Sequence, residues 1–122
     1  MENGQLRENP LKKKSYAFAL RIVQLYKYLT FEMKEFVLSK QVLRSGTSVG
    51  ANVTEGNQAQ SKLDFIHKLA IALKEAVETE YWLSLLRDGE FISDSQAEPL
   101  ILDCKELQRI LTASIKTAKS KR

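Results

Sequence analysis

The stretch that decides the fold is QVLRSGTSVGANVTEG, at residues 41–56. Gly46 and Gly50 each cost about 1 kcal/mol in a helix interior, so propensity alone favours a loop. The spacing favours a helix instead, because two faces repeat at intervals of three and four residues. The first face is apolar or small and consists of Val42, Gly46, Val49, Gly50 and Val53. We therefore predict a helix whose glycines let a neighbouring helix approach closely, a packing gain that offsets the poor propensity.

The second face of this helix is polar. If the chain turns near Ala59 into an antiparallel helix, Arg44 lies opposite about residue 74 and can reach Glu75 or Glu78 in a charge-assisted pair. The residues that share this face or oppose it are Arg44, Ser48, Asn52, Glu55 and Glu78. We predict that these five residues form a structural polar network between the two helices.

Helical periodicity continues on both sides of this stretch. The helix starts are marked by Asn9-Pro10, by Ser61 and by Ser93 or Ser95, residues that cap helices. The four predicted helices run from about residue 10 to 29, 32 to 55, 62 to 87, and 94 to 118. We expect residues 1–9 to form a frayed tail, residues 10–118 to form the bundle domain, and residues 119–122 to form a basic C-terminal tail.

The apolar positions predict which helix faces are buried. The core stripe expected for the third helix is Ile66, Leu69, Ala70, Leu73, Ala76, Val77 and Leu83. The seam expected for the fourth helix is Leu100, Cys104, Leu107, Leu111 and Ala118. The first helix has only a narrow polar stripe, which favours a second buried face against another subunit. Short connections between four helices predict an all-α, up-down-up-down antiparallel bundle.

The charge distribution predicts a basic end. The chain of 122 residues has a net charge of +4, but residues 1–14 hold four basic and two acidic residues, and residues 107–122 hold five basic residues and no acidic residue. In an up-down-up-down bundle both termini lie at the same end, so these charges converge there. The residues expected to contact nucleic-acid phosphates are Lys12, Lys13, Lys14, Lys116, Lys119, Lys121 and Arg122.

The sequence resembles the bacterial four helix bundle protein family, whose members include proteins encoded by intervening sequences within large-subunit ribosomal RNA genes. The resemblance rests on Gln41, Leu43, Arg44, Ser48, Asn52, Glu55 and Gly56, and on Phe65, Ala70, Glu78, Thr79 and Leu83 of the third helix. The related accessory variability proteins of diversity-generating retroelements form pentamers and bind a reverse transcriptase and nucleic acid through basic surfaces. The resemblance therefore implies a ring-shaped homopentamer, and such partners are expectations for this chain.

Several other functions find little support in the sequence. One cysteine and one histidine are too few for a zinc site or for the paired Glu-x-x-His of a di-metal bundle, so we expect no metal or other cofactor. The Ser-Gly-Thr-Ser-Val-Gly run at 45–50 lacks the spacing of a phosphate loop. Because no constellation of polar residues suggests a reaction, we expect no catalytic residues and no enzyme. No apolar run approaches a membrane span and no signal peptide is recognisable, so we expect a cytoplasmic protein without a membrane partner.

Two functions remain open at this stage. The first is a nonenzymatic homo-oligomeric protein that binds RNA or DNA through its basic end. The second is a protein–protein scaffold or accessory subunit that binds no nucleic acid.

Overall fold

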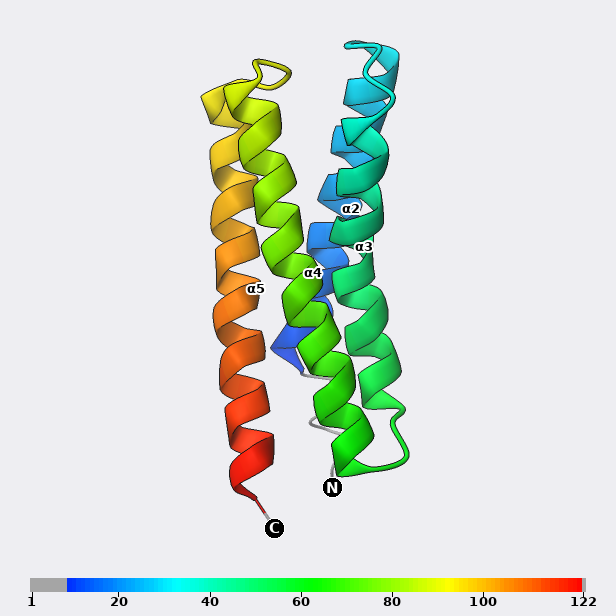
Figure 1. Ribbon diagram of the computed structural model, residues 1–122, viewed down its shortest axis with the longest axis vertical. Coiled ribbons are helices and arrows are strands. Elements are labelled where there is room, and N and C mark those ends of the chain that lie inside the picture. The colour runs from blue at the N-terminus through cyan, green and yellow to red at the C-terminus, as the bar shows by residue number, and fades with distance from the viewer. Residues whose placement is uncertain (1–8, 122) are drawn as a thin grey trace.

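The computed structural model describes residues 9–121, and every regular element in that range is an α-helix. The four helices are α2 (Pro10–Phe31), α3 (Leu38–Asn57), α4 (Lys62–Asp88) and α5 (Asp94–Ser120). They alternate in direction and form one elongated bundle (Figure 1). Each helix contacts the next, and α5 returns to α2, although that last pair packs most loosely. The all-α four-helix bundle predicted from the sequence is confirmed.

Three of the helix starts carry the caps expected from the sequence. The Asn9 side chain accepts hydrogen bonds from two backbone amides of the first turn of α2, and Pro10 occupies the first helical position. Ser61 caps α4. Ser93 and Gln96 form a reciprocal capping box at the start of α5, with hydrogen bonds of 3.1 and 2.8 Å. These side chains satisfy amides that have no partner within their own helix.

The predicted start of the second helix, at residue 32, is wrong. Lys34 has a φ of 54°, a left-handed conformation that no α-helix continues through, and α3 begins only at Leu38. The Glu35 carboxylate then caps α3 from outside, because it accepts hydrogen bonds from three successive backbone amides at 3.1, 2.9 and 2.7 Å. A negative charge at this position also interacts favourably with the helix dipole.

The two glycines of α3 face α2 at a close approach of the two helices. A Cβ atom on Gly46 would stand 2.8 Å from Cγ1 of Ile22, and one on Gly50 would stand 3.2 Å from the carbonyl oxygen of Ser15. The absence of a side chain at these two positions therefore sets the distance between the helices. The role predicted for the small residues of α3 is confirmed.

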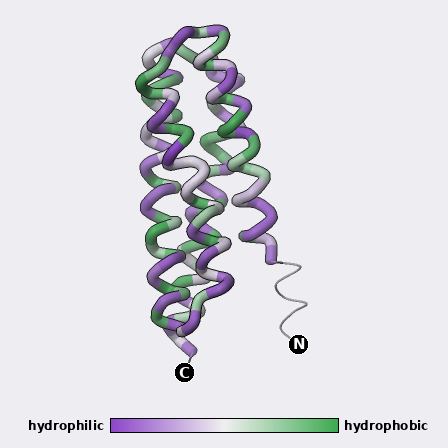
Figure 2. Tube along the Cα trace, turned by 90° about the vertical axis from the view of Figure 1, so that its right-hand side faces the viewer, coloured by the Kyte–Doolittle hydropathy of each residue, from purple (hydrophilic) through white to green (hydrophobic). Residues whose placement is uncertain are grey.

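The core runs the length of the bundle, and Figure 2 shows hydrophobic and hydrophilic positions alternating along the helices. The largest side chains that are completely buried are Phe18, Ile22, Leu29, Val42, Val49, Val53, Leu69, Thr79, Leu83, Leu86, Leu107 and Leu111. The stripe predicted for the third helix is partly wrong, because Val77 is 52% exposed and Thr79 is buried in its place. Thr79 can be buried because its hydroxyl donates to the Glu75 carbonyl and also pairs with the Ser45 hydroxyl at 2.8 Å.

The predicted seam of the fourth helix agrees better with the structure. Leu100, Cys104, Leu107 and Leu111 are buried, and Ala118 is half-buried. The helix extends to Ser120, two residues beyond the expected end of the domain, since no glycine or proline interrupts it there. The expected frayed tail lies outside the described residues except for Asn9. None of the described helices combines the length and hydropathy needed to cross a membrane.

Candidate nucleic-acid interface

Lysines gather at one end of the bundle. α2 begins, α4 begins and α5 ends at this end, which we call the basic end (Figure 1). Lys12, Lys13 and Lys14 are exposed near the start of α2. The last residues of the chain bring three more exposed lysines to the basic end. We call Lys116, Lys119 and Lys121 the C-terminal lysines. Arg122, the seventh residue expected in this set, lies outside the described residues.

The sequence analysis missed one lysine of this end. Lys62 is the first residue of α4, and its ammonium group donates a hydrogen bond to the backbone carbonyl of Lys121. This contact links the start of α4 to the end of α5. The signal was available in the sequence, because Lys62 follows the predicted cap Ser61 and an antiparallel bundle places the start of the third helix beside the end of the fourth.

The lysines differ in their partners. Lys14 forms an ion pair with Glu106 at 3.3 Å, which offsets part of its charge. Among residues 9–121, no carboxylate lies within ion-pair distance of Lys12, Lys13 or Lys62, or of any of the C-terminal lysines. The charges available to an anionic partner are therefore the other six lysines.

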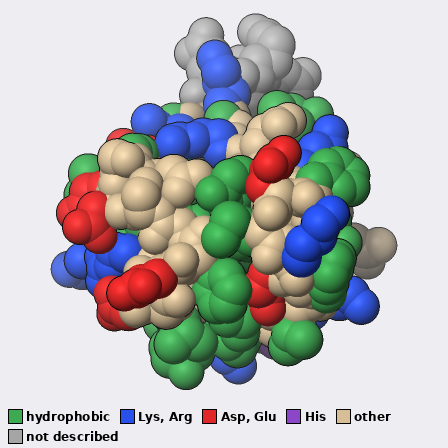
Figure 3. Space-filling view, turned by 90° about the horizontal axis from the view of Figure 1, so that it is seen from above, with side chains coloured by type: hydrophobic (Ala, Val, Ile, Leu, Met, Phe, Trp, Pro, Cys, Tyr) green, Lys and Arg blue, Asp and Glu red, His purple; other side chains and the backbone are tan. Residues whose placement is uncertain are grey.

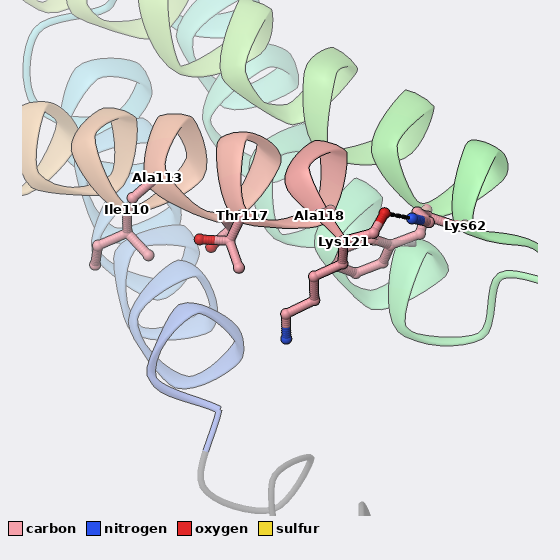
Figure 4. A pocket seen from close by; sticks show the side chains of 8 residues that line it. Lys62, Ile110, Ala113, Thr117, Ala118 and Lys121 are labelled. Carbon is pink, nitrogen blue, oxygen red and sulfur yellow. Dashed lines mark hydrogen bonds between the residues drawn. The ribbon is translucent and has the colours of Figure 1, made fainter.

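These six lysines lie on more than one face. Lys62 and Lys121 line a cavity between α4 and α5, and Phe65 and Ile110 belong to the same lining. Figure 4 shows the hydrogen bond from Lys62 to the end of α5 at this cavity. Lys116 lines a different groove between the same helices, together with Arg109. A third groove, which we call the α2–α3 groove, is lined by Lys12, Lys13, Ser15, Tyr16, Ala19, Thr47, Gly50, Ala51 and Thr54. The basic end thus presents positive charge around its circumference rather than as one flat patch.

The opposite end of the bundle is acidic. The α2–α3 connection holds Glu32 and Glu35 beside Lys34, and Asp88, Glu90 and Asp94 lie at or beside the α4–α5 connection, where Arg87 pairs with Asp88 at 3.0 Å. Tyr28 and Met33 line a groove together with residues of the α4–α5 connection, so the two connections lie side by side. Figure 3 looks onto this end and shows hydrophobic side chains across its middle. The bundle is therefore electrically polar along its axis.

Arg44 lies between two carboxylates of α4, as its register predicted. Its guanidinium group contacts Glu75 at 3.3 Å and forms an ion pair with Glu78. Glu78 also accepts a hydrogen bond of 2.9 Å from the indole N–H of Trp82. The pKa of the Glu78 carboxyl is lowered mainly by the Trp82 hydrogen bond and further by Arg44, and the Glu78 hydrogen bond raises the pKa of Arg44.

The other residues of the predicted polar network do not join these side chains. The Ser48 hydroxyl donates to the Arg44 carbonyl, and the Asn52 amide donates to the Ser48 carbonyl, each one turn earlier in the same helix. Glu55 pairs with Lys68 at 2.8 Å instead. The network is therefore corrected to two separate ion-pair clusters, because serine and asparagine find closer partners in their own helix.

The one cysteine of the chain, Cys104, is buried in the bundle. Its thiol donates to the Ala76 carbonyl at 3.0 Å, and burial raises its pKa to about 12. A thiol in this state is not a nucleophile near neutral pH. Within residues 9–121, no three histidine, cysteine, aspartate or glutamate side chains are grouped so that they could hold a metal ion.

Comparisons with known proteins agree with this architecture. Residues 7–113 match the family model described as 23S rRNA-intervening sequence protein. A solved structure of a protein of unknown function from Bacteroides thetaiotaomicron, of the S23 ribosomal protein family, is 58% identical in sequence. That similarity covers 88% of this chain and 96% of the other, with a TM-score of 0.87. A comparison with curated proteins found no match.

Proposed function

Because the chain belongs to the 23S rRNA-intervening sequence protein family, we propose that it is a nonenzymatic, homo-oligomeric protein that binds nucleic acid through its basic end. The observation that carries this proposal is the set of six lysines without a carboxylate partner in residues 9–121, gathered from three helix ends. These lysines are far apart in sequence, and only the fold brings them together. The same lysines scattered over the surface would improve solubility without forming an interface.

Phosphate contacts are the chemistry that such an end supports best. Exposed ammonium groups neutralise phosphates and release condensed counterions, which gives affinity that depends little on base sequence and strongly on salt. The acidic residues at the other end would repel the same polyanion, so the bundle would approach nucleic acid with its basic end first.

Homo-oligomerisation is the second part of the proposal. Val77 and Tyr81 of α4 are one helical turn apart and 52% and 59% exposed, and Leu102 of α5 is 60% exposed. Val77 lines a groove with Lys105 and Arg109, which share a helical face with Leu102, so all three apolar side chains lie on the α4–α5 side. Large apolar side chains exposed together are typical of contact surfaces between proteins. The family resemblance implies a ring of five copies, in which the basic ends of the subunits would lie along one rim.

A binding titration tests the nucleic-acid part. Structured RNA and duplex DNA are titrated with the wild-type protein and with a variant in which the C-terminal lysines are changed to glutamine. The matched control changes Lys27, Lys40 and Lys74 to glutamine, since these lysines are also exposed but lie away from the end of α5. We expect the C-terminal variant to lose at least tenfold in affinity at physiological salt and the control to lose less than threefold, by the order of magnitude of phosphate contacts. If both variants lose the same affinity, the loss reflects the lower net charge of the protein and not a contact at the basic end.

The protein–protein alternative rests on a different observation. Phe31, Phe36 and Val37 are 53–70% exposed at the acidic end, and Glu35 accepts three backbone hydrogen bonds beside them. Exposed apolar groups suit a protein partner better than a polyanion. If neither RNA nor DNA binds at physiological salt, this end becomes the candidate interface of a scaffold or accessory subunit.

Light scattering measures the subunit number of the same samples, and a monomeric mass would contradict the homo-oligomer.

A further inference from the structure

The α2–α3 groove differs from the other surfaces of the basic end because it combines positive charge with an apolar slot. Its volume is about 630 Å³, and its lining includes Lys12, Lys13 and Tyr16 on one side and Thr47, Gly50 and Thr54 on the other. Lys12 and Lys13 precede Tyr16 by four and three residues, so all three side chains share one face of α2.

The floor of the groove follows from the close approach of the helices. Gly50 has no side chain to fill the seam, and a Cβ atom there would stand 3.2 Å from the carbonyl oxygen of Ser15. The hydroxyl of Thr47, on the wall, already donates to the Leu43 carbonyl at 2.7 Å. The slot therefore has a small-residue floor that leaves room for a flat group, and the charged hydrogen-bond donors of its lining are the ammonium groups of Lys12 and Lys13.

Tyr16 supplies the surface against which such a group can lie. It is 66% exposed, although it stands on a helix whose other faces pack against α3 and α5. An exposed tyrosine ring beside two ammonium groups is the arrangement with which proteins hold single-stranded nucleic acid, because bases stack on the ring while lysines hold the phosphates.

We infer that the α2–α3 groove accepts an unpaired nucleobase stacked on Tyr16, with the flanking phosphates on Lys12 and Lys13. This inference rests on the proposed function and makes it more specific, since it names single-stranded nucleic acid as the preferred ligand. Bases inside a duplex are paired and stacked on one another, so they cannot enter the groove without being flipped out.

Charge favours this occupant over a helix from a second copy of the chain. A packed helix would bury Lys12 and Lys13 or force them aside, and within residues 9–121 neither has a carboxylate partner to offset the loss of solvation. A nucleotide instead brings its own negative charge to the mouth of the groove.

The test compares two single-stranded oligomers of equal length and charge, one of deoxythymidine and one made entirely of abasic sites. The quantity measured is the ratio of their dissociation constants, by fluorescence anisotropy with the full chain. We expect the wild type to bind the base-containing oligomer roughly tenfold more tightly, from the usual contribution of one stacked base. Tyr16→Ala should remove this preference, and Tyr16→Phe should keep it, because stacking needs the ring and not the hydroxyl.

Phe31→Ala is the matched control, since Phe31 is an aromatic residue of the same helix that is 70% exposed but lies at the acidic end of the bundle. Equal binding of both oligomers by the wild type would overturn the inference and leave the proposed function intact. A Tyr16→Ala variant with an unchanged ratio but a changed mass would overturn it too, because a second copy would then occupy the groove. Failure to bind either oligomer, RNA or duplex DNA would overturn both proposals.

Discussion

Replacing Gly46 with alanine tests the close approach of α2 and α3, because two opposing effects have different origins. Helix propensity and the restricted unfolded chain favour alanine by about 1 kcal/mol. The new Cβ atom would, however, stand 2.8 and 2.9 Å from Cγ1 and Cγ2 of Ile22, where carbon atoms prefer roughly 3.5–4.0 Å. Ile22 is completely buried, and these atoms are next to its main chain, so they cannot swing away. Overpacking of this kind costs about 1–3 kcal/mol.

We therefore expect Gly46→Ala to lower the free energy of unfolding by up to about 2 kcal/mol. Urea unfolding followed by far-ultraviolet circular dichroism measures it, at several protein concentrations so that assembly is separated from folding. Gly50→Ala is the matched control, because it has the same propensity gain but a milder contact of 3.2 Å. It should be less destabilising than Gly46→Ala or even stabilising.

A double-mutant cycle identifies the cause. Ile22→Ala removes both Cγ atoms, so Gly46→Ala should become stabilising in that background, with a coupling free energy of about 1–3 kcal/mol. If Gly46→Ala stabilises the wild type by about 1 kcal/mol, then propensity alone decides and the packing argument is refuted.

Three further predictions concern individual side chains. Cys104 should resist thiol reagents in the native protein and react with them in urea. Burial raises its pKa from 9.0 to about 12, so its contribution to stability should be complete below pH 9.0 and decline as the pH rises toward 12. The urea midpoints of the wild type and of Cys104→Ala should therefore converge in alkaline solution. The Arg44–Glu78 pair should stabilise the fold by less than about 1 kcal/mol, because both side chains are more than a third exposed. Since the pKa of Glu78 is lowered by Trp82 and Arg44, this contribution should be present above pH 4.5 and fade as the pH falls through the lowered pKa. The urea midpoints of the wild type and of Arg44→Ala should therefore converge in acid. An Arg44→Ala variant with unchanged unfolding and assembly at neutral pH would refute the role of the pair. Glu35→Gln should cost about 0.5–2 kcal/mol in urea unfolding, since it weakens the cap of α3, and an unchanged midpoint would contradict that role.

Local signals in the sequence were sufficient for much of the fold. Asn9, Ser61 and Ser93 were recognisable as caps because a cap depends on residues within one turn. The buried seam of α5 was recognisable because its apolar residues repeat at regular intervals with few competitors. The approach at Gly46 could be predicted because the two glycines recur one turn apart on the same face as three valines, which indicates a helix packed closely against a neighbour.

The misplaced elements depend on contacts that are distant or unusual. The start of α3 is set by a left-handed Lys34 and a carboxylate cap from Glu35, and no periodicity reveals either. The buried face of α4 was misplaced because Thr79 looks like a surface residue until its partners on α3 and α4 are known. Valine at position 77 looks like core, yet it is exposed on the α4–α5 side.

The candidate site was predictable to a similar extent. The convergence of charge followed from topology, and the position of Arg44 followed from the turn between α3 and α4. The α2–α3 groove was not predictable, because it arises from the distance between two helices at Gly50, which only the packed structure defines.

The salt dependence of duplex DNA binding tests the central claim most directly. Each phosphate neutralised contributes about 0.9 to the slope of log Kobs against log salt concentration. If the C-terminal lysines contact phosphates, changing all of them to glutamine should make the slope shallower by about 3, while the Lys27, Lys40 and Lys74 control keeps the wild-type slope. The same slope for all three proteins would contradict binding through the basic end.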